Sequence, residues 1–138
     1  MTEVPKWARY HHLTLNVQNV DTCERWYREV LGFTRLTSYV TDSFERVILF
    51  HPDAGVTLGV GRHAYPEAEE PFDERRAGLD HLALEVADRD ALDAWVAHFD
   101  AQNVPHSEVK PAAVPGAFLV AFRDPDNIQL EIFAPPRS

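Results

Sequence analysis

The chain has 138 residues, of which 45% are hydrophobic and 25% charged, and its formal net charge is −9. This is the length of one ordinary domain with enough apolar side chains to form its own core. The sequence has no apolar run long enough for a membrane span and no basic stripe, which argues against membrane insertion and against nucleic acid as a partner. A single cysteine, Cys23, and an N-terminus without the features of a secretory signal lead us to expect a cytoplasmic protein.

The second half of the chain repeats the first. The segment 11–17 matches the segment 80–86 at an offset of 69 residues, so that His12 corresponds to His81. The same offset relates the apolar positions of the next segment in each half. Further along, 52–58 resembles 125–130 at an offset of 73 before one gap and 72 after it. A repeat of this kind indicates two copies of one structural unit.

Each half is predicted to form a strand, an amphipathic helix and three further strands. The first strand alternates, and the helix has apolar residues at i, i+3, i+4 and i+7. In chain order we expect a strand at 11–17, a helix from Cys23 to Val30, strands at 34–40, 44–50 and 56–61, a strand at 79–86, a helix from Leu92 to Phe99, and strands at 106–111, 117–123 and 128–133. Asp21 and Asp88 are the expected helix N-caps and Gly32 the expected stop.

This order predicts an α+β fold of two βαβββ modules in tandem within a single domain, residues 1–138. Module 1 covers about 9–61, a proline-bearing charged linker about 62–78, and module 2 about 79–134. One such module leaves a sheet face unburied, so two should pack together in one domain or exchange between chains. We expect a curled mixed sheet around a central cleft, with the helices outside.

Three polar residues stand out on the sheet faces turned away from the helices. Strand alternation places His12 opposite Leu13, His81 opposite Leu82, and Glu131 opposite Leu130 and Ile132. If the sheets curl around one cleft, the two histidines approach each other near the pseudo-twofold axis and Glu131 completes the set. Two imidazoles and one carboxylate are a ligand set typical of Fe2+, and also suit Mn2+, Co2+, Ni2+ or Zn2+, with coordination positions left open for substrate.

At this point the sequence resembles the vicinal-oxygen-chelate superfamily, which includes glyoxalase I, extradiol dioxygenases, methylmalonyl-CoA epimerases, fosfomycin-resistance enzymes and bleomycin-binding proteins. The motifs that carry the resemblance are 12–17, Trp26-Tyr27, 30–33, 78–81, 122–127 and 130–132. The resemblance implies metal positions at His12, Gly59, His81 and Glu131. Glycine has no ligand, so the four-ligand site of glyoxalase I is incomplete unless His63 substitutes.

The resemblance leaves the reaction open. The second-shell histidine and tyrosine of extradiol dioxygenases align with Ala112 and Ala121, and only Lys110 and Arg123 offer a cationic cradle of the kind fosfomycin enzymes need. Beside the metal, His63 and Glu85 are the candidate catalytic residues, and His11 has the wrong strand parity. Further candidates to line a pocket for an aromatic or acidic substrate are Arg46, Tyr65, Phe72, Phe118 and Phe122.

Two functions follow from these residues. The first is an enzyme, expected to be a homodimer, that uses one divalent metal, with Fe2+ or Mn2+ ahead of Zn2+, Ni2+ or Co2+, to chelate a small organic substrate through neighbouring oxygens. Its class is dioxygenase, lyase or isomerase. The alternative is a metal-free protein that binds or sequesters a small molecule, of the bleomycin-resistance type.

Overall fold

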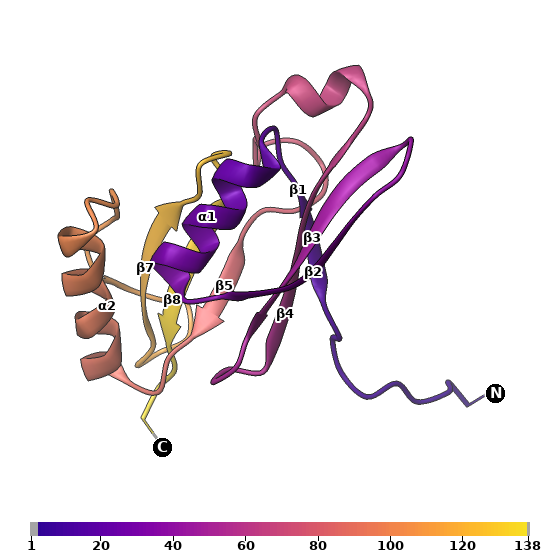
Figure 1. Ribbon diagram of the computed structural model, residues 1–138. Coiled ribbons are helices and arrows are strands. Elements are labelled where there is room, and N and C mark those ends of the chain that lie inside the picture. Colours follow the sequence, from indigo (N-terminus) through magenta and orange to yellow (C-terminus); the bar gives the residue numbers. More distant parts are fainter. Residues whose placement is uncertain (1–2, 138) are drawn as a thin grey trace.

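The computed structural model describes residues 3–137 and contains the two predicted modules (Figure 1). Module 1 consists of β1 (Leu13–Asn16), α1 (Val20–Leu31), β2 (Thr34–Val40), β3 (Phe44–His51) and β4 (Val56–His63). Module 2 consists of β5 (Leu82–Glu85), α2 (Arg89–Ala101), β6 (Lys110–Pro111), β7 (Phe118–Arg123) and β8 (Gln129–Ala134). A short 3-10 helix, η1 (Pro66–Glu69), lies in the linker.

Each module forms its own four-stranded mixed sheet. The strand orders are β1-β4-β3-β2 and β5-β8-β7-β6, with the first and last strands of each module parallel and the other pairs antiparallel. This confirms the predicted α+β class. It also confirms the repeat at the level of register, because Thr14 lies beside Gly59 in module 1 as Ala83 lies beside Glu131 in module 2.

The helix ends agree with the prediction at two of three positions. Asp88 caps α2 by accepting a hydrogen bond from the Ala91 N–H at 2.9 Å. Gly32 ends α1 in the left-handed region, with φ 81°. The expected cap Asp21 is wrong: the N-cap of α1 is Asn19, whose side chain accepts from the Thr22 N–H at 3.0 Å, and Asp21 lies inside the first turn.

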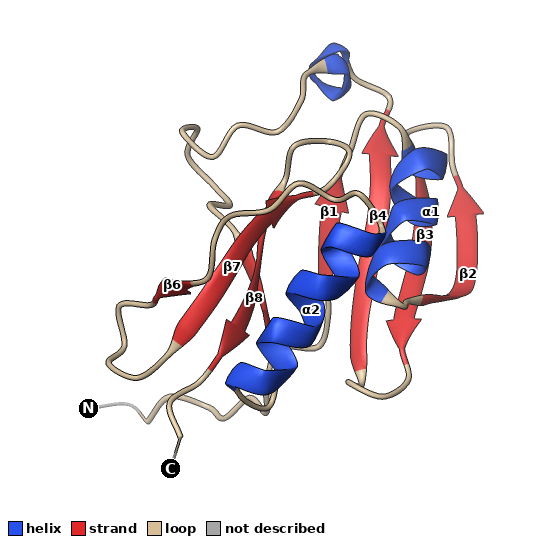
Figure 2. Cartoon of the chain, turned by 90° about the vertical axis from the view of Figure 1, so that its left-hand side faces the viewer, coloured by secondary structure: helices blue, strands red, loops and turns tan. Residues whose placement is uncertain are grey.

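The two helices lie on the same side of the molecule, each over the sheet of its own module (Figure 2). The apolar strand residues beneath them are buried, for example Leu49 and Val60 in module 1 and Leu130 and Ile132 in module 2. Cys23 is a buried core residue, as predicted. In the described part of the chain the opposite face of each sheet carries no helix, and we call these two surfaces the helix-free faces.

Helix α1 also holds the modules together. The Tyr27 hydroxyl donates to the Asp124 carboxylate at 2.8 Å, and the Trp26 ring lies 6.0 Å from the ring of Phe122. The helices are joined by a contact of 2.8 Å between Nε2 of His98 and the Val30 carbonyl. In the described residues 3–137, no helix is long and apolar enough to cross a membrane.

Candidate metal and substrate site

The helix-free face of the second sheet brings His81 and Glu131 together. His81 directly precedes β5, and Glu131 projects from the neighbouring strand β8 between the buried Leu130 and Ile132. Nε2 of His81 lies 3.4 Å from Oε1 of Glu131. Both neighbours of Glu131 across the sheet are alanines, Ala83 and Ala121, so only small side chains lie beside it on these strands.

Asp80 orients the His81 ring. Its carboxylate oxygen lies 2.7 Å from Nδ1 of His81 and also accepts from the Gln129 amide at 3.2 Å. The hydrogen bond to Asp80 raises the pKa of His81, and the negative charge of Glu131 raises it further. A carboxylate on Nδ1 is the usual support of a metal-binding histidine, because it fixes the tautomer that leaves Nε2 free as a ligand. His81 and Glu131 therefore supply two donors of the kind that divalent metal ions take.

The sequence reasoning missed Asp80 and Gln129. A signal was present, because an acid directly before a candidate ligand histidine can reach its second ring nitrogen. Its significance depends on the ring orientation, which a strand pattern does not specify.

Within one chain, His12 lies apart from the His81–Glu131 pair. It is exposed just before β1, with its Nδ1 2.8 Å from Nδ1 of the adjacent His11. Within residues 3–137, no group of three histidine, cysteine, aspartate or glutamate side chains is arranged to hold a metal ion. The structure thus unites two of the three predicted ligands and leaves the third on the other sheet.

Position 59 shows why module 1 has no equivalent of Glu131. A Cβ atom on Gly59 would come within 2.6 Å of Oγ1 and 3.1 Å of Cβ of Thr14. Thr14 therefore fills the space that a side chain at position 59 would need. In module 2 the arrangement is reversed, since Ala83 is small and Glu131 occupies the space.

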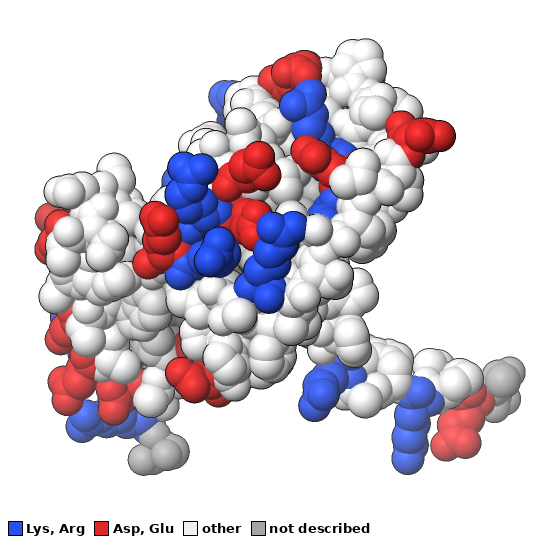
Figure 3. Space-filling view, viewed as in Figure 1, with Lys and Arg blue, Asp and Glu red and all other residues white. Residues whose placement is uncertain are grey.

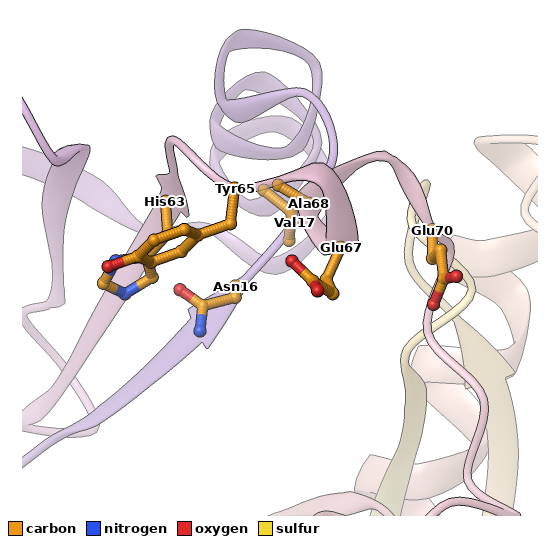
Figure 4. A pocket seen from close by; sticks show the side chains of 7 residues that line it. All are labelled: Asn16, Val17, His63, Tyr65, Glu67, Ala68 and Glu70. Carbon is orange, nitrogen blue, oxygen red and sulfur yellow. The ribbon is translucent and has the colours of Figure 1, made fainter.

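A pocket of about 290 Å³ lies between the end of β1 and the linker helix η1. Figure 4 shows the rings of His63 and Tyr65 side by side at one end, Glu70 at the other, and Asn16 and Glu67 between them. The two rings are stacked with centroids 6.0 Å apart. A volume of this size suits a small organic molecule.

The other predicted residues have different surroundings. Glu85 is exposed at the end of β5 and does not line this pocket. Phe122 is buried in the core, and Phe72 and Phe118 are half-buried against it. Arg123 pairs with both carboxylate oxygens of Glu74, at 2.7 and 3.0 Å, on the wall of a second, more open pocket of about 520 Å³ in the linker.

The charges on the face seen in Figure 3 are mixed. Lys and Arg side chains there lie among Asp and Glu side chains and do not gather into one basic surface. This face does not have the continuous positive charge with which proteins bind a phosphate backbone.

Comparisons with known proteins agree with this geometry. Residues 9–132 match the family described as the Glyoxalase/Bleomycin resistance protein/Dioxygenase superfamily. The uncharacterized protein YaeR of Escherichia coli K12 is 28% identical over 128 residues, which cover 89% of this chain and 93% of that protein.

Two solved structures illustrate the similarity in fold. A glyoxylase/bleomycin resistance protein/dioxygenase domain from Frankia sp. EAN1pec is 28% identical with a TM-score of 0.80, over 93% of this chain and 92% of that one. The fosfomycin resistance protein FosX of Listeria monocytogenes, in complex with Mn(II) and sulfate, is 17% identical with a TM-score of 0.68, over 94% of each chain.

Proposed function

Because the chain belongs to the Glyoxalase/Bleomycin resistance protein/Dioxygenase superfamily, we propose that it is a divalent-metal-dependent enzyme that chelates a small organic substrate through two neighbouring oxygens. The observation that carries this proposal is the His81–Glu131 pair, supported by Asp80 on the second nitrogen of the histidine. The Mn(II) held by FosX supports a divalent ion in a protein of this fold. The proposal covers dioxygenase, lyase and isomerase chemistry.

We further propose that the site is completed in a homodimer. Two ligands lie on the second sheet and His12 on the first, so one copy supplies an incomplete set. Within residues 3–137 nothing covers the helix-free faces of the two sheets, and the first of them exposes apolar surface on the edge strand β2, where Tyr39 is 43% exposed. Packing the first sheet of one copy against the second sheet of another brings His12 toward the partner's His81 and Glu131 and buries this apolar surface.

The protein side chains have separate roles in this site. A divalent ion, when bound, supplies a Lewis acid that polarises the substrate oxygens. Asp80 holds the proton on Nδ1 of His81, and the small side chains of Ala83 and Ala121 leave room for substrate beside Glu131. His63 in the pocket is the candidate proton acceptor, with Glu85 the second candidate.

Metal content tests the proposal. Protein prepared without chelators should contain one divalent ion per chain by elemental analysis. The variants His12→Ala, His81→Ala and Glu131→Ala should each lose most of it. His63→Ala is the comparison variant: retained metal excludes His63 as a ligand, and lost metal marks it as a fourth ligand. Full metal content in all three ligand variants would refute this metal site, whereas wild-type protein that contains no metal would favour the metal-free binding protein.

Mixing two variants tests the shared site. When His12→Ala and His81→Ala proteins are mixed and allowed to exchange subunits, one of the two sites in each mixed dimer regains a complete ligand set. Random exchange should restore about a quarter of the wild-type metal content. A site built within one copy would show no recovery, as would mixing His81→Ala with Glu131→Ala, which is the negative control.

A further inference from the structure

A row of four side-chain positions crosses the helix-free face of the first sheet. The register places Asn16, Gly61, Arg46 and Tyr39 next to one another on β1, β4, β3 and β2. Neighbouring strands lie about 4.8 Å apart, so Asn16 and Arg46 are separated by roughly 10 Å. Gly61 between them has no side chain, and the Arg46 side chain lies over it.

Gly61 also allows the Arg46 side chain to lie close to the sheet. A Cβ atom on Gly61 would come within 3.2 Å of Nε of Arg46 and 2.9 Å of the Glu45 carbonyl oxygen. The guanidinium carbon lies 4.6 Å from the centre of the Phe44 ring. The aromatic ring and the glycine therefore hold the Arg46 side chain in place.

The hydrogen-bonding capacity of Arg46 is largely unused. Nη1 donates to the Tyr39 hydroxyl at 3.3 Å, and the buried Nε has no hydrogen-bond partner among the described residues. A buried donor without an acceptor costs free energy and calls for an explanation. Nη2 likewise has no hydrogen-bond partner among the described residues, but it is not buried, so a ligand can supply its acceptor.

Comparison with the other half-buried arginines makes Arg46 distinctive. Within residues 3–137 three arginines are half-buried, and two of them form ion pairs: Arg62 with Glu69, and Arg123 with Glu74. Arg46 has no carboxylate within 4.0 Å in the same part of the chain. The protein has 22 acidic residues and a net charge of −9, so a lack of available carboxylates does not account for this.

We propose that Arg46 binds the carboxylate of the substrate, which makes the substrate class a small organic acid. The planar guanidinium matches a carboxylate in shape and charge, and the register places Asn16 and Tyr39 at the two ends of the row that contains Arg46. His63 lies on the same face, with its ring 5.6 Å from that of Phe44. Because it concerns the substrate of the proposed enzyme, this assignment rests on the proposed function. Binding of the anion by Arg46 needs no metal.

Binding of simple probes to the metal-free, full-length protein tests the inference. Benzoate, phenylphosphonate and benzyl alcohol present the same ring with a planar anion, a tetrahedral anion and no charge. We expect benzoate to bind most tightly in calorimetric or NMR titrations. Arg46→Gln should weaken benzoate binding about 10- to 100-fold, the effect of one charged hydrogen-bonding group. Arg46→Lys, which keeps the charge without the planar fork, should fall between, and Arg25→Gln on α1 should match the wild type.

Three results would overturn the inference. In the first, benzoate binds no more tightly than benzyl alcohol. In the second, Arg46→Gln binds benzoate as tightly as the wild type does. In the third, phenylphosphonate binds more tightly than benzoate. If Arg46→Gln does not fold, the comparison of Arg46→Lys with the wild type decides. Because no metal is present, loss of this site and loss of the metal site are separate outcomes.

Discussion

At the scale of single residues, Thr14 and Gly59 form a complementary pair. The Thr14 side chain fills the space above Gly59, whereas in module 2 Ala83 leaves the equivalent space to Glu131. Each of these pairs holds at most one side chain larger than alanine. The packing of β1 against β4 therefore accounts for the lack of a side chain at position 59, and with it for the lack of a fourth protein ligand in the proposed metal site.

Adding a Cβ atom at position 59 tests this pairing. Gly59→Ala should lower the free energy of unfolding by about 1–3 kcal/mol, because Thr14 must shift. The double variant Thr14→Ala/Gly59→Ala should recover most of that loss. Urea denaturation of the wild type, both single variants and the double variant gives the coupling energy. Simple additivity of the two single effects would contradict the steric explanation.

Asp80 provides a second test at this scale. Removing its carboxylate in Asp80→Ala frees the His81 ring to rotate and lowers its basicity as a ligand. Metal affinity, measured by competition with a chromophoric chelator, should fall about 10- to 100-fold. Asp93→Ala, at an exposed aspartate on α2 that pairs with Arg89, is the control and should leave metal affinity unchanged. An equal affinity for Asp80→Ala and wild type would remove Asp80 from the site.

At the scale of elements, the start of α1 depends on a single hydrogen bond. Asn19→Ala removes the side-chain acceptor of the Thr22 N–H and should cost about 0.5–2 kcal/mol. Asp21→Ala loses only a charge in the first turn, worth about 0.3–1 kcal/mol. Chemical denaturation of the two variants should rank Asn19→Ala as the less stable, and the reverse order would assign the cap to Asp21.

Strand prediction succeeded where alternating apolar residues are bounded by turn residues. It failed where side chains take the place of backbone groups as hydrogen-bond partners. The predicted strand 34–40 is β2 itself, whereas the predicted strand 106–111 pairs only at Lys110–Pro111, with an isolated bridge at His106. Between them, the Ala121 N–H donates to the Ser107 hydroxyl instead of to a backbone carbonyl. Pro105 and Pro111 lack the N–H that a regular strand would use.

At the scale of the whole molecule, the repeat predicted which residues are equivalent but not how the modules pack. The repeat pairs His12 with His81 and Gly59 with Glu131, and strand alternation predicted that His12, His81 and Glu131 lie on the faces turned away from the helices. The packing of the modules depends on contacts such as that of Tyr27 with Asp124, 97 residues apart. No periodicity within one strand encodes such a contact, so the separation of His12 from His81 within one copy could not be foreseen.

The Asp124 carboxylate between the modules makes stability depend on pH. Burial raises the pKa of Asp124 to about 6 from 3.8, against the lowering effect of hydrogen bonds from the Ile128 N–H, the Tyr27 hydroxyl and the Asp126 N–H. Between pH 4 and 6 the folded state therefore holds a proton that the unfolded state has released. The free energy of unfolding decreases as pH rises through this window, and the contribution of Asp124 is constant above it.

Asp124→Asn should remove this dependence while keeping the local hydrogen bonds. The amide oxygen can accept from the N–H groups of Asp126 and Ile128, and the amide nitrogen can donate to the Tyr27 hydroxyl oxygen. The stability of Asp124→Asn relative to the wild type should therefore increase by up to about 3 kcal/mol between pH 4 and pH 7, following the pKa difference. Urea titrations across this range measure it, with Asp93→Asn as the exposed control. Parallel stability curves for Asp124→Asn and wild type would show that the carboxylate between the modules titrates at its ordinary pKa and that its burial does not govern the pH dependence.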